Sequence, residues 1–90
     1  MKLIYCRECR DIVRLAHHTR YCECGKSRGW YEEDGLHATI GGPCIPLGIH
    51  NGDFALARNN RRSSGPGFRF EAWVIPEKCD TVNEEDPNGE

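Results

Sequence analysis

Four cysteines near the start of the chain are the residues whose type and spacing best suit chemistry. Cys6 and Cys9 form one close pair, Cys22 and Cys24 form a second, and twelve residues separate the two pairs. A zinc ion prefers about four sulfur or nitrogen ligands in a tetrahedron, at roughly 2.3 Å from each sulfur. Two cysteine pairs at such a distance are the usual pattern of a metal site. We therefore predict that these four thiolates bind one Zn²⁺ ion.

Three other interpretations of these cysteines stay open. Two disulfides would need an oxidising compartment, and the chain does not start with the basic segment, apolar run and cleavage site of a secretion signal. Iron could occupy the same four-sulfur cage. His17 or His18, between the two pairs, could replace one thiol, although we expect both at a solvated bend. Reduced thiols favour a cytoplasmic protein.

Length and charge indicate one small domain followed by a tail. Ninety residues bury a modest core, so a bound metal would compensate for missing apolar contacts. Residues 1–76 carry eleven basic and eight acidic side chains, whereas residues 77–90 carry six acidic side chains and one lysine. We expect residues 1–76 to form the domain and the acidic tail, residues 77–90, to be disordered. No apolar run approaches the roughly twenty residues that cross a bilayer.

Short strands should position the cysteine pairs. The apolar residues 1–5 end directly at the first thiol and predict a strand. Because the chain must run out from the first pair and back to the second, we expect a hairpin between the pairs. Residues 12–15 would form its outgoing strand and residues 20–21 its return. Gly25, directly after the second pair, suits a tight turn that only glycine adopts readily.

A second hairpin is predicted around Asp34 and Gly35. Asp-Gly between two strand-like runs is typical of a two-residue type I′ turn, which needs positive φ at both positions. The strands would cover residues 29–33 and 36–40. Trp30, Leu36, Ala38 and Ile40 would then line one core face.

The second half of the chain alternates loops with short elements. Residues 41–52 are rich in glycine and proline and predict a packed loop, either structural or ligand-binding. Asp53 would cap a short helix over residues 54–59. Residues 59–67 are typical of an exposed loop. Residues 68–75 alternate and predict a strand. Phe68 and Phe70 would face the core with Ala72 and Val74, while Trp73 would lie on the opposite face.

Arginine and aromatic side chains form a second candidate site. Arginines contact phosphates, and aromatic rings stack on unpaired bases, so this mixture would suit nucleic acid. The near-neutral domain and the acidic tail instead favour a protein partner. With the loop at residues 41–52, the predicted binding residues are Arg28, Trp30, His50, Arg58, Arg61, Arg62, Arg69 and Trp73.

The cysteine pairs, Gly25 and the hairpin arrangement resemble the zinc-ribbon class over residues 1–40, and the start of the chain is similar to small bacterial or phage zinc-ribbon proteins. This resemblance implies a mostly-β fold built on two zinc knuckles, with the four cysteines as ligands. Members of the class bind nucleic acid or proteins, so the resemblance does not choose the function.

These observations favour a non-enzymatic zinc-binding recognition module that binds a protein, as a small bacterial or phage regulator would. Two alternatives stay open. One is a zinc ribbon that binds nucleic acid. The other is a site for a small ligand or for catalysis in the loop at residues 41–52, using His37, Cys44 or His50.

Overall fold

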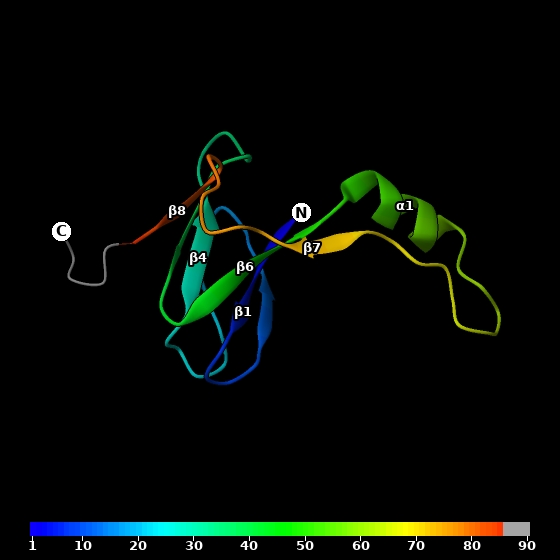
Figure 1. Ribbon diagram of the computed structural model, residues 1–90, viewed down its shortest axis with the longest axis horizontal. Helices are drawn as coiled ribbons and strands as arrows, with labels where there is room; N and C mark the ends of the chain where they lie inside the picture. Colours follow the sequence, from blue (N-terminus) through cyan, green and yellow to red (C-terminus); the bar gives the residue numbers. More distant parts are fainter. Residues whose placement is uncertain (86–90) are drawn as a thin grey trace.

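The computed structural model describes residues 1–85, which form two four-stranded sheets and one helix (Figure 1). The first sheet has the strand order β2-β1-β6-β7 and the second the order β3-β4-β5-β8. The prediction of a small, mostly-β chain with one short helix is therefore confirmed. The elements are β1 (Lys2–Cys6), β2 (Ile12–Arg14), β3 (Arg20–Tyr21), β4 (Arg28–Tyr31), β5 (Ala38–Gly41), β6 (Cys44–Ile49), α1 (Asn51–Asn59), β7 (Ala72–Val74) and β8 (Val82–Glu84).

The two sheets share one small core. Its buried side chains come from both sheets and from the segments that follow β2 and β3: Ile4, Cys6, Val13, Leu15, Cys22, Ala38, Ile40 and Cys44. Gly29 on β4 allows the sheets to approach, because a Cβ atom there would lie 2.9 Å from the Leu15 side chain. Three of the eight core residues are cysteines, so the core has few large apolar groups.

The strands on either side of each cysteine pair are hydrogen-bonded to each other. β1 pairs with β2, which places Ile4 opposite Val13, and β3 pairs with β4, which places Arg20 opposite Gly29. The hairpin predicted between the two pairs is therefore wrong. Each cysteine pair is itself the turn of a hairpin, so the chain leaves the first sheet after β2 and enters the second sheet at β3.

The hairpin predicted around Asp34 and Gly35 is present, formed by β4 and β5, but its turn spans residues 32–37. Among the residues of this turn only Gly35 has a positive φ, 68°, so a type I′ turn is not formed. The Asp34 carboxylate instead accepts the amides of Leu36 and His37, each at 2.9 Å. Leu36, predicted to lie in the core, is 54% exposed because the wider turn carries it outward.

The loop prediction for residues 41–52 is also wrong, because half of this segment is β6, an inner strand of the first sheet. β6 pairs with β1 along most of its length, with Cys44 opposite Cys6. Proline lacks an N–H and rarely lies inside a sheet. In β6, Pro46 lies opposite Ile75, whose amide donates to the Pro46 carbonyl at 2.9 Å. Because β7 ends at Val74, the N–H that Pro46 lacks would face a point just beyond the end of that strand.

Helix α1 begins at Asn51, directly after His50, whereas the sequence predicted a start directly after Asp53. The His50 side chain is the N-cap and accepts the Asp53 amide at Nδ1, at 3.1 Å. Asp53 lies in the first turn, where a carboxylate interacts favourably with the positive end of the helix dipole. In the part of the chain that the structure describes, no helix has the length and apolar character needed to cross a membrane.

A long excursion between β6 and β7 carries α1 away from the two sheets (Figure 1). We call residues 50–74 the arm. Phe54 of α1 packs edge to face on Phe70, with ring centroids 5.0 Å apart. Between them, residues 60–67 are exposed throughout, as predicted for a loop. The arm lengthens the molecule, whose principal extents are 50 × 28 × 23 Å.

The strand predicted over residues 68–75 is limited to β7, which has three residues. Trp73 lies opposite Gly48, and a Cβ atom on Gly48 would lie 2.6 Å from the Trp73 ring. Trp73 is nevertheless 45% exposed and Phe70 is 41% exposed. The predicted burial of Phe70 is wrong, because Phe70 precedes β7, the edge strand at the base of the protruding arm. Trp73 was expected on the opposite face of the strand, as a binding residue.

Part of the acidic tail predicted to be disordered is a strand. β8 pairs parallel with β5, which places Val82 opposite Ala38. Beyond its end, the Glu85 amide donates to the Ile40 carbonyl at 2.7 Å, and the Glu85 carboxylate accepts Nε of Arg28 at 3.0 Å. The rest of the predicted tail, residues 86–90, lies outside the described residues.

Candidate metal centre

The two cysteine-containing turns bring four sulfurs together. Cys6 is the last residue of β1 and Cys9 follows in the turn to β2, while Cys22 and Cys24 lie in the turn from β3 to β4. The four Sγ atoms all lie within 4.8 Å of one another. The predicted set of ligands is therefore assembled, and it can hold a metal ion.

Both turns are closed by the same backbone pattern. The residue after each pair has a left-handed conformation, with φ of 66° at Arg10 and 79° at Gly25. Each of these residues donates its amide to the carbonyl of the first cysteine of its pair, Arg10 to Cys6 at 2.8 Å and Gly25 to Cys22 at 3.0 Å. The second turn is one residue shorter because its cysteines are separated by one residue. The tight turn predicted at Gly25 is confirmed.

The sulfur separations suit metal coordination, and the structure forms no disulfide among residues 1–85. The Sγ atoms of Cys22 and Cys24 are 3.4 Å apart, and those of Cys6 and Cys24 are 3.8 Å apart. A disulfide bond would bring the two sulfurs to about 2.05 Å. All six cysteines of the chain are free thiols in the structure.

Ser27 supports the sulfur cluster from inside the core. Its amide donates to Cys22 Sγ at 3.3 Å, which favours a thiolate there. Its side chain is fully buried, and Oγ has no hydrogen-bond partner of good geometry among the described residues. This hydroxyl nevertheless lies beside Cys6 and helps to lower its pKa. A deprotonated Cys6 would supply the acceptor that the buried hydroxyl lacks.

Crowding of the thiols drives their pKa values apart. The Cys9 amide and the Ser27 hydroxyl lower the pKa of Cys6 to about 6. The Lys26 amide favours the Cys24 thiolate, but burial and three neighbouring sulfurs outweigh it and raise the pKa of Cys24 to about 12. A first thiolate therefore opposes further deprotonation, and a cation is required to hold four thiolates together.

The structure distributes the predicted binding residues between the two sheets and the arm. Arg28 on β4 is paired with Glu85, Trp30 on the same strand is half-buried, and His50 is the helix cap. The other five lie on the arm and are all exposed: Arg58, Arg61, Arg62, Arg69 and Trp73.

The residues considered for a site in the loop at residues 41–52 each have a separate local role. The His37 ring pairs with Asp34 in the β4–β5 turn. Cys44 Sγ is buried on β6 and donates to the Gly41 carbonyl at 3.5 Å. His50 caps α1.

Sequence reasoning missed two residues that shape the centre, Asp11 and Ser27. The Cys6 amide donates to the Asp11 carbonyl at 2.9 Å, and the Cys22 amide donates to the Ser27 carbonyl at 3.0 Å. The Asp11 carboxylate also accepts the Glu23 amide at 2.9 Å, which links the two turns. Each residue lies five positions after the first cysteine of its pair, and this repeated offset was the available signal.

The centre is thus a cage of four sulfurs whose ligands, closing amides and supporting hydroxyl come from two hairpins. Comparison of the chain with protein families, curated proteins and solved structures finds no match.

Proposed function

We propose that the four cysteines bind a structural zinc ion. Four sulfurs at about 2.3 Å from a central zinc ion would lie about 3.8 Å apart in an ideal tetrahedron. The separations of 3.4 and 3.8 Å that involve Cys24 support this fit. Four protein ligands leave no open position for a substrate or an activated water, which supports a structural and non-enzymatic role.

The zinc ion would connect the two sheets. Cys6 and Cys9 come from the hairpin of the first sheet, and Cys22 and Cys24 come from that of the second. The shared core contains few large apolar side chains, so metal binding would supply part of the folding free energy. The sheets held in this way carry the arm at one end of the molecule (Figure 1).

We propose further that the arm binds a protein partner. The observation that carries this proposal is the exposure of large apolar side chains on the arm, while only Ala57 of α1 is buried. Tryptophan and arginine are enriched among the residues that dominate binding at protein interfaces. The arm presents both types beside exposed aliphatic groups. The exposed apolar residues are Leu56, Phe70, Trp73 and Val74.

The charge of the arm favours a partner with acidic groups. Residues 50–74 contain four arginines against Asp53 and Glu71, which gives a formal net charge of plus two. Among the described residues none of these arginines forms an ion pair. They are therefore available to pair with carboxylates around an apolar centre.

Affinity capture from the native host, with the immobilised zinc-loaded chain, tests this proposal. We expect one specific protein to be retained by the wild type and lost with a Leu56→Ser/Phe70→Ser variant, because that change removes apolar contacts from the arm. Leu36→Ser is the matched control, since Leu36 is equally exposed but lies on the β4–β5 turn. Equal recovery of all proteins with the wild type and the arm variant would refute the arm as the binding surface.

Nucleic acid is the second candidate, supported by the same unpaired arginines and by Arg62, which stacks over the Phe68 ring at 5.2 Å. Arginine and aromatic side chains together suit an unpaired strand. Fluorescence anisotropy with a single-stranded oligonucleotide would then show binding that weakens steeply with added salt, because phosphate contacts release counterions. Binding that does not depend on salt would exclude this candidate.

A further inference from the structure

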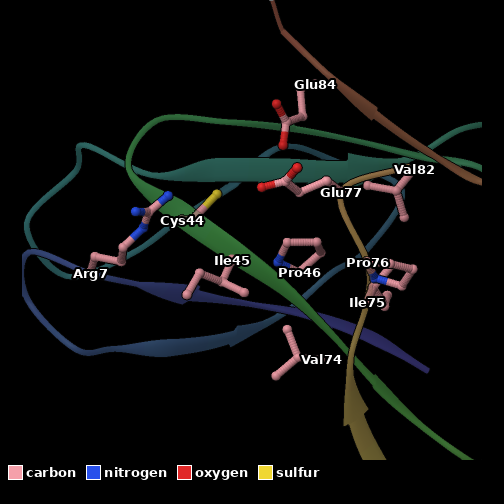
Figure 2. Close-up of a pocket in the computed structure, with 10 residues that line it drawn as sticks. All are labelled: Arg7, Cys44, Ile45, Pro46, Val74, Ile75, Pro76, Glu77, Val82 and Glu84. Carbon is pink, nitrogen blue, oxygen red and sulfur yellow. The ribbon is translucent and has the colours of Figure 1, made fainter. Parts of the chain in front are cut away.

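A cavity of about 610 Å³ lies between β6 and the segment that carries the chain from β7 to β8 (Figure 2). Its size is within the range of roughly 300 to 1,000 Å³ that small-ligand pockets occupy. A smaller cavity of about 230 Å³ adjoins it and shares Arg7, Cys44 and Glu84. We call the two together the seam groove, because they follow the junction of the two sheets.

The wall of the larger cavity is mostly apolar. Figure 2 shows Ile45 and Val74 on the side opposite the two glutamates, with Pro46 between them. Ile75 is buried at 6% exposure and its amide donates to the Pro46 carbonyl at 2.9 Å, so these two residues of the wall are fixed to each other. The apolar lining residues are Ile45, Pro46, Val74, Ile75, Pro76 and Val82.

Two carboxylates in the groove lack a cationic partner. Glu77 and Glu84 line the larger cavity, and neither forms an ion pair with a residue of the described chain. Glu85, the next acidic residue, is already paired with Arg28. Arg7 is the one basic residue lining the larger cavity, so the lining there has a formal net charge of minus one.

We propose that the seam groove binds a basic, apolar peptide segment of a partner protein. A lysine or arginine side chain would pair with Glu77 and Glu84, while a neighbouring apolar side chain would pack against Pro46 and Ile75. Pairing between a cation and a carboxylate in a partly enclosed groove forms the stronger, charge-assisted type of hydrogen bond. This inference does not depend on the arm, whose exposed arginines and apolar side chains lie outside the groove apart from Val74.

The test uses the full zinc-loaded chain and two blocked tripeptides, acetyl-Leu-Lys-Val-amide and acetyl-Leu-Glu-Val-amide. In ¹⁵N-¹H correlation spectra, we expect millimolar amounts of the lysine peptide to shift the amides of Cys44, Ile45, Val82 and Glu84. The glutamate peptide should leave them unchanged. A Glu77→Gln/Glu84→Gln variant should weaken binding of the lysine peptide by about tenfold, because it removes both charge-assisted contacts.

Two controls separate the groove from other surfaces. Glu33→Gln removes an exposed carboxylate of the β4–β5 turn and should leave binding unchanged. Arg61→Ala/Arg62→Ala changes only the arm and should also leave binding of the lysine peptide unchanged. The same variant should weaken binding of the protein partner proposed for the arm. Equal shifts with both peptides, shifts confined to the arm, or no shifts at all would each overturn the proposal.

Discussion

The Arg28 guanidinium on β4 donates to the Glu85 carboxylate, which follows β8, and so ties the C-terminal strand to an inner strand of the second sheet. The pair is partly shielded, with side-chain exposures of 34% and 25%. Glu85 also raises the pKa of Arg28 by hydrogen bonding and by its charge. The parallel pairing of β5 with β8 closes the seam groove on one side, so this ion pair supports the groove wall.

Removing the charge of Glu85 should loosen β8 without unfolding the chain. In a Glu85→Gln variant, we expect the amide at position 85, which donates to the Ile40 carbonyl, to exchange its hydrogen up to about fivefold faster, because a partly exposed ion pair contributes modestly. Hydrogen exchange followed by NMR measures this rate. Glu84→Gln is the matched control, since Glu84 forms no ion pair within residues 1–85. Equal exchange in both variants would show that the pair does not hold the strand.

Zinc binding should require the four clustered cysteines but not Cys44, which is buried outside the cluster. We expect native mass spectrometry to find one zinc ion in the wild type and in a Cys44→Ala variant, because Cys44 is not one of the four clustered sulfurs. Cys22→Ala should lose the metal and the dispersed amide spectrum of a folded chain, since one ligand is missing from a centre that joins both sheets.

A chelator should act on the wild type as Cys22→Ala does. Addition of EDTA at neutral pH should remove the metal and the fold together, and zinc should restore both. A fully folded, metal-free chain would contradict the structural role of the centre. Iron in place of zinc would be recognised by elemental analysis and by its visible absorption.

The cysteine set could be predicted from the sequence because its information is local. Two close pairs that are each closed by a left-handed residue need no knowledge of distant partners, and Gly25 already indicated one of the turns. Strand β6 could not be predicted in this way. Its pairing joins residues far apart in the chain, such as Lys2 and Gly48, and its glycine and proline content is typical of loops.

The errors on the acidic tail and on the aromatic strand have a similar origin. Acidic composition predicted disorder for the segment that contains Glu85, but the structure supplies Arg28 as its partner. Alternation predicted that Phe68 and Phe70 face the core, but β7 lies at the edge of the sheet and Phe70, which precedes it, is 41% exposed. Burial depends on which layer faces a strand, and periodicity alone does not contain that information.

The left-handed residues of the two turns should respond to substitution in opposite ways. Arg10 has φ of 66°, which costs a residue with a side chain about 1 to 2 kcal/mol. Arg10→Gly should therefore stabilise the zinc-loaded chain by about 0.5 to 1 kcal/mol, after the larger unfolded-state entropy of glycine is subtracted. Arg10→Ala is the control, because it removes the side chain but keeps the strain.

The second turn supplies the reciprocal test. Gly25 has φ of 79°, and a Cβ atom added there would meet no atom within 4 Å beyond its chain neighbours, so Gly25→Ala isolates the backbone effect. We expect a loss of about 1 kcal/mol in the free energy of unfolding, measured by urea denaturation at fixed free zinc. Equal stability of Arg10→Gly and Arg10→Ala, or no loss in Gly25→Ala, would mean that the turns relax.

Metal affinity should fall as the pH falls, with a slope set by the thiols that must lose protons. The pKa of Cys24 is about 12 before metal binds, so this thiol releases a proton on binding throughout the neutral range. Each released proton makes the affinity change about tenfold per pH unit. Below about pH 6, Cys6 is also protonated before binding, and the dependence should become steeper there.

Competition with a chromophoric chelator of known proton dependence, from about pH 8 down to about pH 5, measures this slope. Calorimetry in buffers of different ionisation enthalpy counts the released protons directly. Cys24→Asp is the matched variant, because a carboxylate can bind zinc and is already ionised at neutral pH, so it should bind more weakly and release about one proton fewer. If zinc affinity in Cys24→Asp had the same pH slope as in the wild type, Cys24 would not be a thiol that loses its proton on binding. A zinc affinity that does not change with pH in the wild type would exclude binding by four thiolates.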